Sequence, residues 1–293
     1  MSPTPVPGRE SISTVETPMM GIPQTCAVYV VDCPEPAIID TGPADAVDRI
    51  FAGLDDLGID EDEVSYIVPT HAHLDHAGGV GHLAAECKNA TVVCHPKAVD
   101  FLTDEAQLAH LTDAVERAIG MESPYGEPRR IDRDRCTVLG DGDVLEIGDR
   151  ELDVIDAPGH APHQFCLYDR ETTALFAADA AGMRFPDTGH RPTTPPSDFD
   201  LEQKLNTIGR LREFEPELLL YPHFGSGEEG GGMDELAEYA ETLPAYVEQV
   251  AQARKTHGDD VGAIASEMPE WQHWSLQADI AGILRYLDQR EGE

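Results

Sequence analysis

The first third of the chain alternates short apolar runs with segments of helical periodicity. The runs CAVYVVD and PAIID are separated by turn residues at 33–36, so they predict a β-hairpin that ends in the motif IDTG. The same pattern predicts four further elements in this third: a helix over 44–57, a strand over 64–70, a helix over 78–87 and a strand over 91–96.

The rest of the chain begins with a helical pattern, continues in β segments and ends in helices. The acidic helical pattern over 97–125, which ends at Gly120, predicts a helical insert. Several β segments follow, and after a Pro-rich loop come a predicted helix over 201–214, a strand and loop over 218–225 and a helical extension over 233–293. We therefore expect a flexible lead-in rich in Pro, Ser and Thr over 1–24, a main domain over 25–226 and the C-terminal extension.

Length and composition suit one large α/β domain with an appendage. The chain has 293 residues, and at 41% hydrophobic it can bury a sizeable core. No run approaches the roughly 18–20 apolar residues that are needed to span a bilayer. The start, MSPTPVPGRE, has no basic segment followed by an apolar one, which a secretory signal would have. The default prediction is a soluble cytoplasmic protein.

The charge of the chain is strongly unbalanced. It has 56 acidic and 20 basic residues, for a net charge of −36, and the excess is spread along the chain. Such a surface repels nucleic acid and anionic membranes, so we expect neither as a partner and expect a small-molecule substrate instead. The charge favours a halophilic protein in a high-salt cytoplasm, where ions screen self-repulsion within about 3 Å at 1 M. Composition leaves the oligomeric state open.

The segment THAHLDHAGG holds four potential metal ligands within six positions, namely His71, His73, Asp75 and His76. In an extended loop, residues i and i+2 point to the same side, so His71 and His73 converge on one point. Asp75 and His76 follow where the chain turns into a helix, and they face a second point. Because the four side chains cannot all surround one ion tetrahedrally, the segment predicts a site for two divalent ions.

Two ions need more ligands, and these stand at the ends of later β segments. The motif APGHAPH offers His160, with His163 as a spare, LFAAD offers Asp179, and LLLYPHFG offers His223. Loops that a rigid sheet holds at its edge are where functional side chains usually gather. Tyr221, two residues before His223, either donates a hydrogen bond to a substrate oxygen or is a packed tyrosine at a strand end.

The motifs IDTG, HAHLDH, APGH, FAAD and YPHFG resemble those of the metallo-β-lactamase superfamily, in the order expected there. The resemblance covers the main domain and implies an α/β fold, a four-layer αββα sandwich with a metal site at one edge. The helical extension after the last motif resembles the glyoxalase II-like branch. Two departures stand out: Ala178 precedes the late aspartate where the superfamily usually has Gly, and His163 lies where the thioesterase branch often has a Thr-Pro-Gly run.

The resemblance also implies a role for each candidate residue. The ligands it implies are His71, His73 and His160 for one ion, Asp75, His76 and His223 for the other, and Asp179 as the bridge between them. Asp40 of IDTG would orient a ligand histidine or its loop. The ions implied are Zn²⁺, with Fe or Mn as alternatives. The helical insert would form a wall or lid at the mouth of the site.

The charge of such a centre favours hydrolysis. Two divalent ions carry four positive charges, of which two aspartates and a bridging hydroxide remove three, so one remains to hold a polarised acyl or phosphoryl oxygen. Asp75 is placed to aim the hydroxide. We therefore expect a metal-dependent hydrolase of a small ester-like substrate, above all a thioester. The alternatives are a lactonase or carboxylic esterase, then a mono-iron persulfide dioxygenase, then a nuclease.

Overall fold

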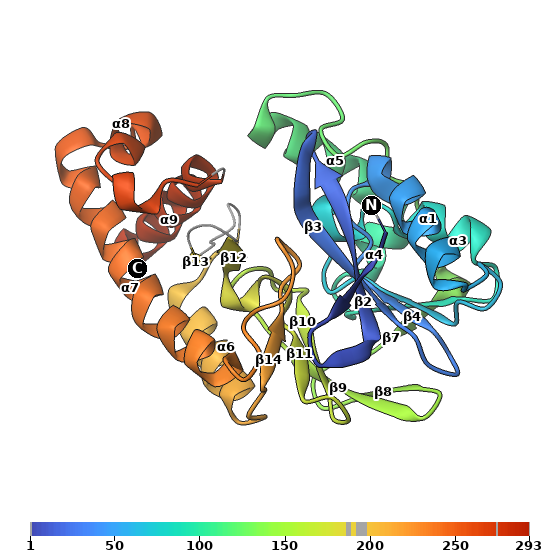
Figure 1. Ribbon diagram of the computed structural model, residues 1–293. Coiled ribbons are helices and arrows are strands. Elements are labelled where there is room, and N and C mark those ends of the chain that lie inside the picture. The colour runs from blue at the N-terminus through green and yellow to red at the C-terminus, as the bar shows by residue number, and fades with distance from the viewer. Residues whose placement is uncertain (1, 186–188, 192–197, 274, 293) are drawn as a thin grey trace.

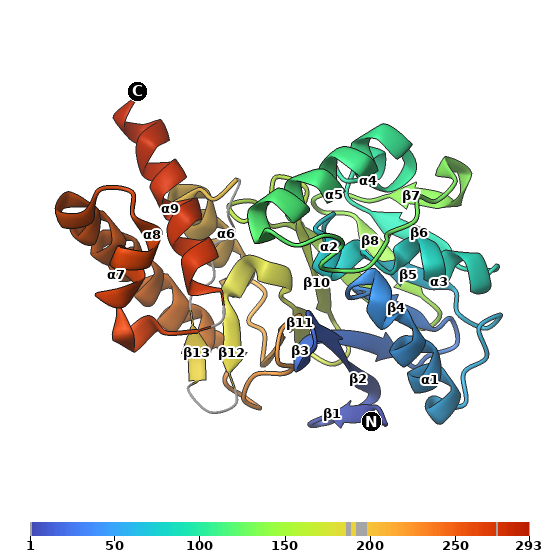
Figure 2. The same cartoon turned by 90° about the horizontal axis from the view of Figure 1, so that it is seen from above.

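The computed structural model describes residues 2–185, 189–191, 198–273 and 275–292. Two β-sheets lie face to face, and helices cover the outer face of each sheet (Figures 1 and 2). The layers therefore run helix, sheet, sheet, helix, and the predicted αββα sandwich is confirmed.

The N-terminal sheet follows the chain order β1-β2-β3-β4-β5-β6-β7. Its strands are β1 (Thr4–Val6), β2 (Arg9–Met19), β3 (Ile22–Val31), β4 (Ala37–Ile39), β5 (Tyr66–Val68), β6 (Thr91–Cys94) and β7 (Cys136–Val138). Pairing is antiparallel from β1 to β4 and parallel from β4 to β7. The predicted hairpin that ends in IDTG is the antiparallel pair β3–β4.

The C-terminal sheet has the order β14-β11-β10-β9-β8. Its strands are β8 (Val144–Ile147), β9 (Arg150–Asp156), β10 (Phe165–Asp169), β11 (Ala174–Phe176) and β14 (Leu218–Leu220), of which only β11 and β14 pair in parallel. A separate hairpin joins β12 (Met183–Phe185) to β13 (Gly189–Arg191). The loops after β5, β9, β11 and β14 carry the candidate ligands, so the two sheets bring these loops to one edge.

The helices divide between the two outer layers (Figure 1). On the side of the N-terminal sheet lie α1 (Val47–Leu57), α2 (Leu74–Ala77), α3 (Val80–Glu86), α4 (Val99–Thr103) and α5 (Glu105–Ile119). The other side holds α6 (Leu201–Arg212), α7 (Gly232–His257), α8 (Val261–Ser266) and α9 (Leu276–Glu291). Within the described residues, none of these helices is long and apolar enough to cross a membrane.

Three apolar clusters fill the three spaces between the layers. In β3, Ala27, Tyr29 and Val31 pack toward the C-terminal sheet, whereas Val28 and Val30 pack toward the helices of the N-terminal side. Side chains of a strand alternate between its two faces, so this strand, which lies between two layers, is apolar on both. A third cluster lies between the C-terminal sheet and α6, α7 and α9.

The flexible lead-in predicted for residues 1–24 is wrong, because this segment forms β1, β2 and the start of β3. Strand β2 pairs with β3 along most of its length and joins it through Met20 and Gly21, whose φ angles of 51° and 75° suit a two-residue hairpin turn. The apolar pattern does not predict this strand, because several of its buried residues are polar, among them Thr14 and Thr17. Backbone pairing with β3 holds it in place, together with its few buried apolar side chains.

The C-terminal helices do not stand apart from the sandwich. Leu236 and Tyr239 of α7 and Ile280 of α9 share one apolar cluster with Leu175 of β11 and Leu219 of β14. The segment predicted as an extension over 233–293 therefore supplies much of the outer layer that covers the C-terminal sheet. That sheet would otherwise leave an apolar face in water.

Candidate metal centre

The histidine-rich loop follows β5 and turns at once into the single-turn helix α2. His73 lies just before the helix in an extended conformation, and Asp75 and His76 are on the helix itself. Leu74 is buried and anchors the turn. This change from extended to helical backbone turns the first two histidines and the next two ligands toward different points, as the sequence predicts.

The glycines that end THAHLDHAGG are required by close backbone contacts. A Cβ on Gly78 would lie 2.3 Å from the carbonyl oxygen of Leu74, and one on Gly79 would lie 2.6 Å from that of Thr41. Thr41 in turn donates from its backbone N–H and its hydroxyl to the carbonyl oxygen of His76. The loop after β4 thereby holds the helix that presents Asp75 and His76.

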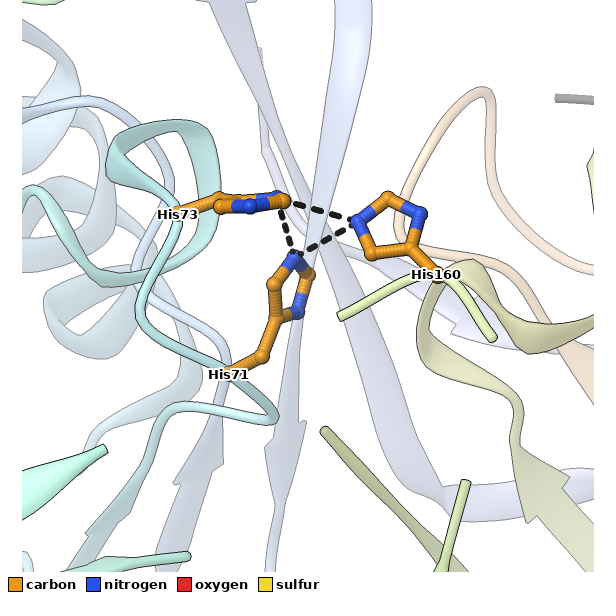
Figure 3. Close-up of side chains that lie close together, drawn as sticks. All are labelled: His71, His73 and His160. Carbon is orange, nitrogen blue, oxygen red and sulfur yellow. Dashed lines mark hydrogen bonds between the residues drawn. The ribbon is translucent and has the colours of Figure 1, made fainter. Parts of the chain in front are cut away.

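One half of the centre consists of His71, His73 and His160, which we call the three-histidine half. Their ring nitrogens point toward one another (Figure 3), and His160 Nε2 lies 3.2 Å from His71 Nε2 and 3.0 Å from His73 Nδ1. His71 Nε2 and His73 Nδ1 are 3.0 Å apart. His71 and His160 are buried, whereas His73 is partly exposed and marks the side that faces solvent.

The other half consists of Asp75, His76 and His223, which we call the mixed half. Asp75 Oδ2 lies 3.7 Å from His76 Nε2 and 3.8 Å from His223 Nε2. Asp179 lies between the halves, since its Oδ2 is 3.2 Å from His160 Nε2 and 3.4 Å from His76 Nε2, and its Oδ1 is 3.6 Å from His223 Nε2. The structure thus brings together all seven side chains that the sequence singled out.

The geometry and chemistry of these side chains fit two cations. Tetrahedral zinc with Zn–N bonds of 2.0–2.1 Å holds its nitrogens about 3.3 Å apart, close to the spacing in the three-histidine half. Buried polar atoms that lack a hydrogen-bond partner are costly, and His76 Nε2 and Asp179 Oδ1, which face this space, have none among the described residues. The ligand atoms form overlapping groups that could each hold an ion.

The two halves differ in their protonation. Burial lowers the pKa of His71 and of His160 well below the ordinary value, and nearby histidines add to the shift of His71. Burial acts the same way on His76, but Asp179, Asp75 and Asp40 outweigh it and raise its pKa well above the ordinary value. Burial also opposes the charge of Asp179, yet His160 and His76 outweigh it and lower its pKa. Without metal, His76 of the mixed half is therefore a protonated imidazolium, whereas His71 and His160 of the three-histidine half are neutral imidazoles.

Asp40, the aspartate of IDTG, touches the ligand loop at two points. Its Oδ1 accepts a hydrogen bond of 2.8 Å from the backbone N–H of Thr70, and its Oδ2 lies 3.0 Å from Nδ1 of His76. A carboxylate at Nδ1 keeps the proton on that nitrogen and leaves Nε2 free to bind a cation. Asp40 thus contacts both the candidate ligand His76 and the loop that carries it.

Backbone strain gathers around the centre. Asp40, Ala178 and Phe224 have φ angles of 59°, 45° and 65°, a region that non-glycine residues seldom adopt, and the last two adjoin Asp179 and His223. The methyl group of Ala178 therefore costs conformational energy, of order 1–3 kcal/mol, rather than space alone. This explains why glycine suits the position before the aspartate.

Two buried side chains that hold the ligand loops had no signal in the sequence. Gln164 donates to the carbonyl oxygen of Ala157 at 2.9 Å and accepts from the backbone N–H of Asp179 at 3.3 Å. Lys204 of α6 is fully buried and donates from Nζ to the carbonyl oxygen of Asp179, and burial lowers its pKa to about 8. A lone lysine in an amphipathic helix resembles any exposed lysine, so only tertiary packing identifies it.

The remaining candidates separate clearly. Tyr221 is fully buried, and its hydroxyl donates to Glu235 at 3.0 Å, so it is the packed tyrosine of the two alternatives. The insert reaches the centre through Phe101 of α4, whose ring lies 5.4 Å from that of His163. His163 itself is buried beside His73 and belongs to none of the possible metal-binding groups among the described residues.

Comparison with known proteins points to one family. The family model described as "Metallo-beta-lactamase superfamily" matches residues 21–223. The chain is 30% identical over 207 residues to the "Metallo-beta-lactamase fold-containing protein ST1585" of Sulfurisphaera tokodaii, a match that covers 69% of this chain and 74% of that protein.

A second group of relatives is named for a thioesterase activity. The chain is 34% identical over 118 residues to "Acyl-coenzyme A thioesterase MBLAC2" of Gallus gallus and 32% identical over 117 residues to its counterpart in Homo sapiens. These matches cover 38% of this chain and 40% and 39% of the two thioesterases. The chain therefore spans well under half the length of the thioesterases it matches.

Solved structures agree on the fold. The crystal structure of ST1585 from Sulfolobus tokodaii superposes with a TM-score of 0.71 at 23% identity, covering 94% of this chain and 98% of that one. A metallo-β-lactamase family protein from Thermus thermophilus, TTHA1429, gives a TM-score of 0.67 at 20% identity, covering 98% and 95%. Both likenesses extend over the C-terminal helices as well as the sheets.

Proposed function

The chain belongs to the metallo-β-lactamase superfamily and is a metal-dependent hydrolase, and we propose that it is a dinuclear zinc enzyme that cleaves small thioesters. The observation that carries the proposal is the convergence of seven side chains in two halves that share Asp179. One carboxylate between two sets of ligands suits a pair of ions better than a single one.

The residues of the centre divide the chemistry between them. When bound, divalent ions polarise an acyl oxygen and lower the pKa of water to about 7, which supplies hydroxide at neutral pH. Asp75 is the partly exposed carboxylate of the mixed half, with 18% of its side chain accessible, so it accepts a hydrogen bond from the attacking water and aims it. Asp40 and Lys204 hold His76 and Asp179 so that the ligands need no rearrangement.

The choice of a thioester rests on the relatives and on the resemblance to the glyoxalase II-like branch. The reported relatives from Gallus gallus and Homo sapiens bear the name of an acyl-coenzyme A thioesterase. The helices that follow the last candidate ligand resemble those of the glyoxalase II-like branch, which help to bind the small thiol of its substrate. We therefore expect a thioester of a smaller thiol, of the hydroxyacyl-glutathione type.

Elemental analysis and a substrate panel test the proposal together. Purified protein should carry two zinc ions per chain and turn over a glutathione-type thioester faster than an acyl-coenzyme A, a carboxylic ester or a lactone. A chelator should abolish this activity and zinc should restore it. Turnover of lactones alone would contradict the thioesterase choice, and a single iron with oxygen uptake would contradict hydrolysis altogether.

We further infer that the protein works in a cytoplasm of high salt. The 56 acidic residues far outnumber the 20 basic ones, so self-repulsion destabilises the folded chain until salt screens it. The melting temperature should rise steadily between low salt and molar KCl. A melting temperature that salt leaves unchanged would contradict this inference.

A further inference from the structure

His163 is buried next to the three-histidine half without belonging to it. It lies in the loop between β9 and β10, three residues after His160, and is 6% exposed. Its ring lies 5.6 Å from that of His73 in an edge-on arrangement and 6.1 Å from that of His71, stacked at 19°. The ring of Phe101, from the insert, also packs against it, with the two ring centroids 5.4 Å apart.

A backbone hydrogen bond decides which nitrogen of His163 carries the proton. The N–H of Ala72, which lies between two ligand histidines in the chain, points at Nδ1 of His163 over 3.3 Å. Nδ1 must therefore accept, and in the neutral ring the proton lies on Nε2.

Nε2 of His163 is a donor whose surroundings in the described part of the chain provide no acceptor. Among the described residues nothing accepts a hydrogen bond from it, yet it is not one of the solvent-inaccessible polar atoms that lack a partner. The atom therefore keeps contact with solvent although its ring is wedged between Phe101 and the ligands. Its ring adjoins His73, the partly exposed side chain of the three-histidine half.

We propose that His163 is a catalytic residue that donates a hydrogen bond from Nε2 to the acyl oxygen of the substrate as negative charge builds up there. This inference rests on the proposed hydrolysis of an ester-like bond. A neutral imidazole held by the backbone is suited to this task, because it stabilises an oxyanion without having to give up its proton. His163 flanks the three-histidine half, so the oxygen it meets is the one drawn toward that half.

Two substitutions separate this role from a structural one. In His163→Asn the amide oxygen can still accept from Ala72, but the outer donor is lost. In His163→Gln the longer side chain can place an N–H near the position of Nε2, but it gives up the contact with Ala72. The matched control is His95→Asn, since His95 is also buried and also accepts a backbone N–H at Nδ1, from Lys97, but its Nε2 faces Asp156.

The experiment compares metal-loaded variants in two assays. We expect His163→Asn to keep two ions per chain, to lose roughly 100-fold in kcat on the best substrate of the panel with little change in KM, and to lose by a similar factor whether the leaving group is good or poor. Its affinity for phenylphosphonate, a tetrahedral oxyanion, should fall by roughly 10-fold or more. His163→Gln should lose less, and His95→Asn should keep the affinity of the wild type.

The phosphonate assay keeps this inference distinct from the proposed function. If no substrate of the panel is turned over, the proposed function fails, yet the affinities still decide the role of His163. Equal phosphonate affinity of wild type and His163→Asn, or no binding by the wild type, would overturn the proposal. Loss of an ion in His163→Asn would overturn the proposal, because it would make His163 a metal ligand. A fall in kcat confined to substrates with poor leaving groups would also overturn it, because His163 would then protonate the departing sulfur.

Discussion

The two halves of the metal centre are built on opposite electrostatic principles. In the three-histidine half, neutral imidazoles face one another at 3.0 to 3.2 Å, and burial keeps protons away from His71 and His160. In the mixed half, Asp75 and Asp179 lie beside His76, which keeps a second proton when no metal is bound. The first half is preformed for a cation, whereas the second balances its own charge and must release a proton to bind one.

Substitution of Asp179 should have the largest effect, because this side chain lies close to histidines of both halves. In Asp179→Asn we expect metal content to fall in both halves and kcat to fall by at least about 100-fold, since even partners of ligands contribute 10- to 100-fold. Elemental analysis after dialysis and steady-state kinetics measure these effects. A variant that keeps two ions and most of its activity would show that Asp179 is no bridge.

Substitution of one ligand unique to each half should separate the halves. We expect His73→Asn and His223→Asn each to keep one ion and to lose most activity, because each leaves the other half's own ligands intact. The ion that remains in His223→Asn should bind in the three-histidine half and be less sensitive to pH, since no proton has to leave. Metal titrations at two pH values check this, and loss of both ions from either variant would show that the halves fold as one unit.

Substitution of Asp40 should affect the mixed half alone. An asparagine can accept from only one of the two groups that Asp40 contacts, the N–H of Thr70 and Nδ1 of His76. We expect Asp40→Asn to weaken one of two metal-binding steps by about 10- to 100-fold and to leave the other step unchanged. Competition with a chromophoric chelator resolves the two steps. Equal weakening of both steps would mean that Asp40 supports the whole loop.

The smallest effect concerns the stability of the metal-free protein as pH changes. Below about pH 6.5 the unfolded chain takes up protons that the buried His71 and His160 do not accept, so the free energy of unfolding falls as pH falls. Above about pH 6.5 the folded protein keeps a proton on His76 that the unfolded chain has lost, so stability also falls as pH rises.

We therefore expect the melting temperature of the metal-free protein to pass through a maximum near pH 6.5. On either side it should fall by roughly 2–4 °C for each kcal/mol by which the free energy of unfolding decreases. Saturation with zinc should shift the maximum to higher pH, because the ion needs His76 without its proton. Calorimetry across pH with and without zinc measures both curves. A metal-free curve that rises steadily with pH would contradict the proton on His76.

The sequence by itself determined the candidate ligands and the order of elements that carry them. These histidines and aspartates lie in short motifs at the ends of apolar runs, and local backbone rules are enough to point His71 and His73 the same way. The role of Asp40, by contrast, is implied only by the resemblance of IDTG to a superfamily motif. Pattern reading failed at residues 1–24, where polar side chains form buried strands, because pairing with β3 is a long-range property.

Only the tertiary structure decided what surrounds the ligands. Several contacts join segments that are distant in the chain. Gln164 and Lys204 form hydrogen bonds with the backbone of Asp179, the Tyr221 hydroxyl donates to Glu235, and the N–H of Ala72 donates to His163. A side chain's type limits the bonds it can make, but its partners are set by how the sheets and helices pack. Short sequence motifs are therefore enough to identify candidate metal ligands, whereas the orientation and protonation of these side chains depend on the fold as a whole.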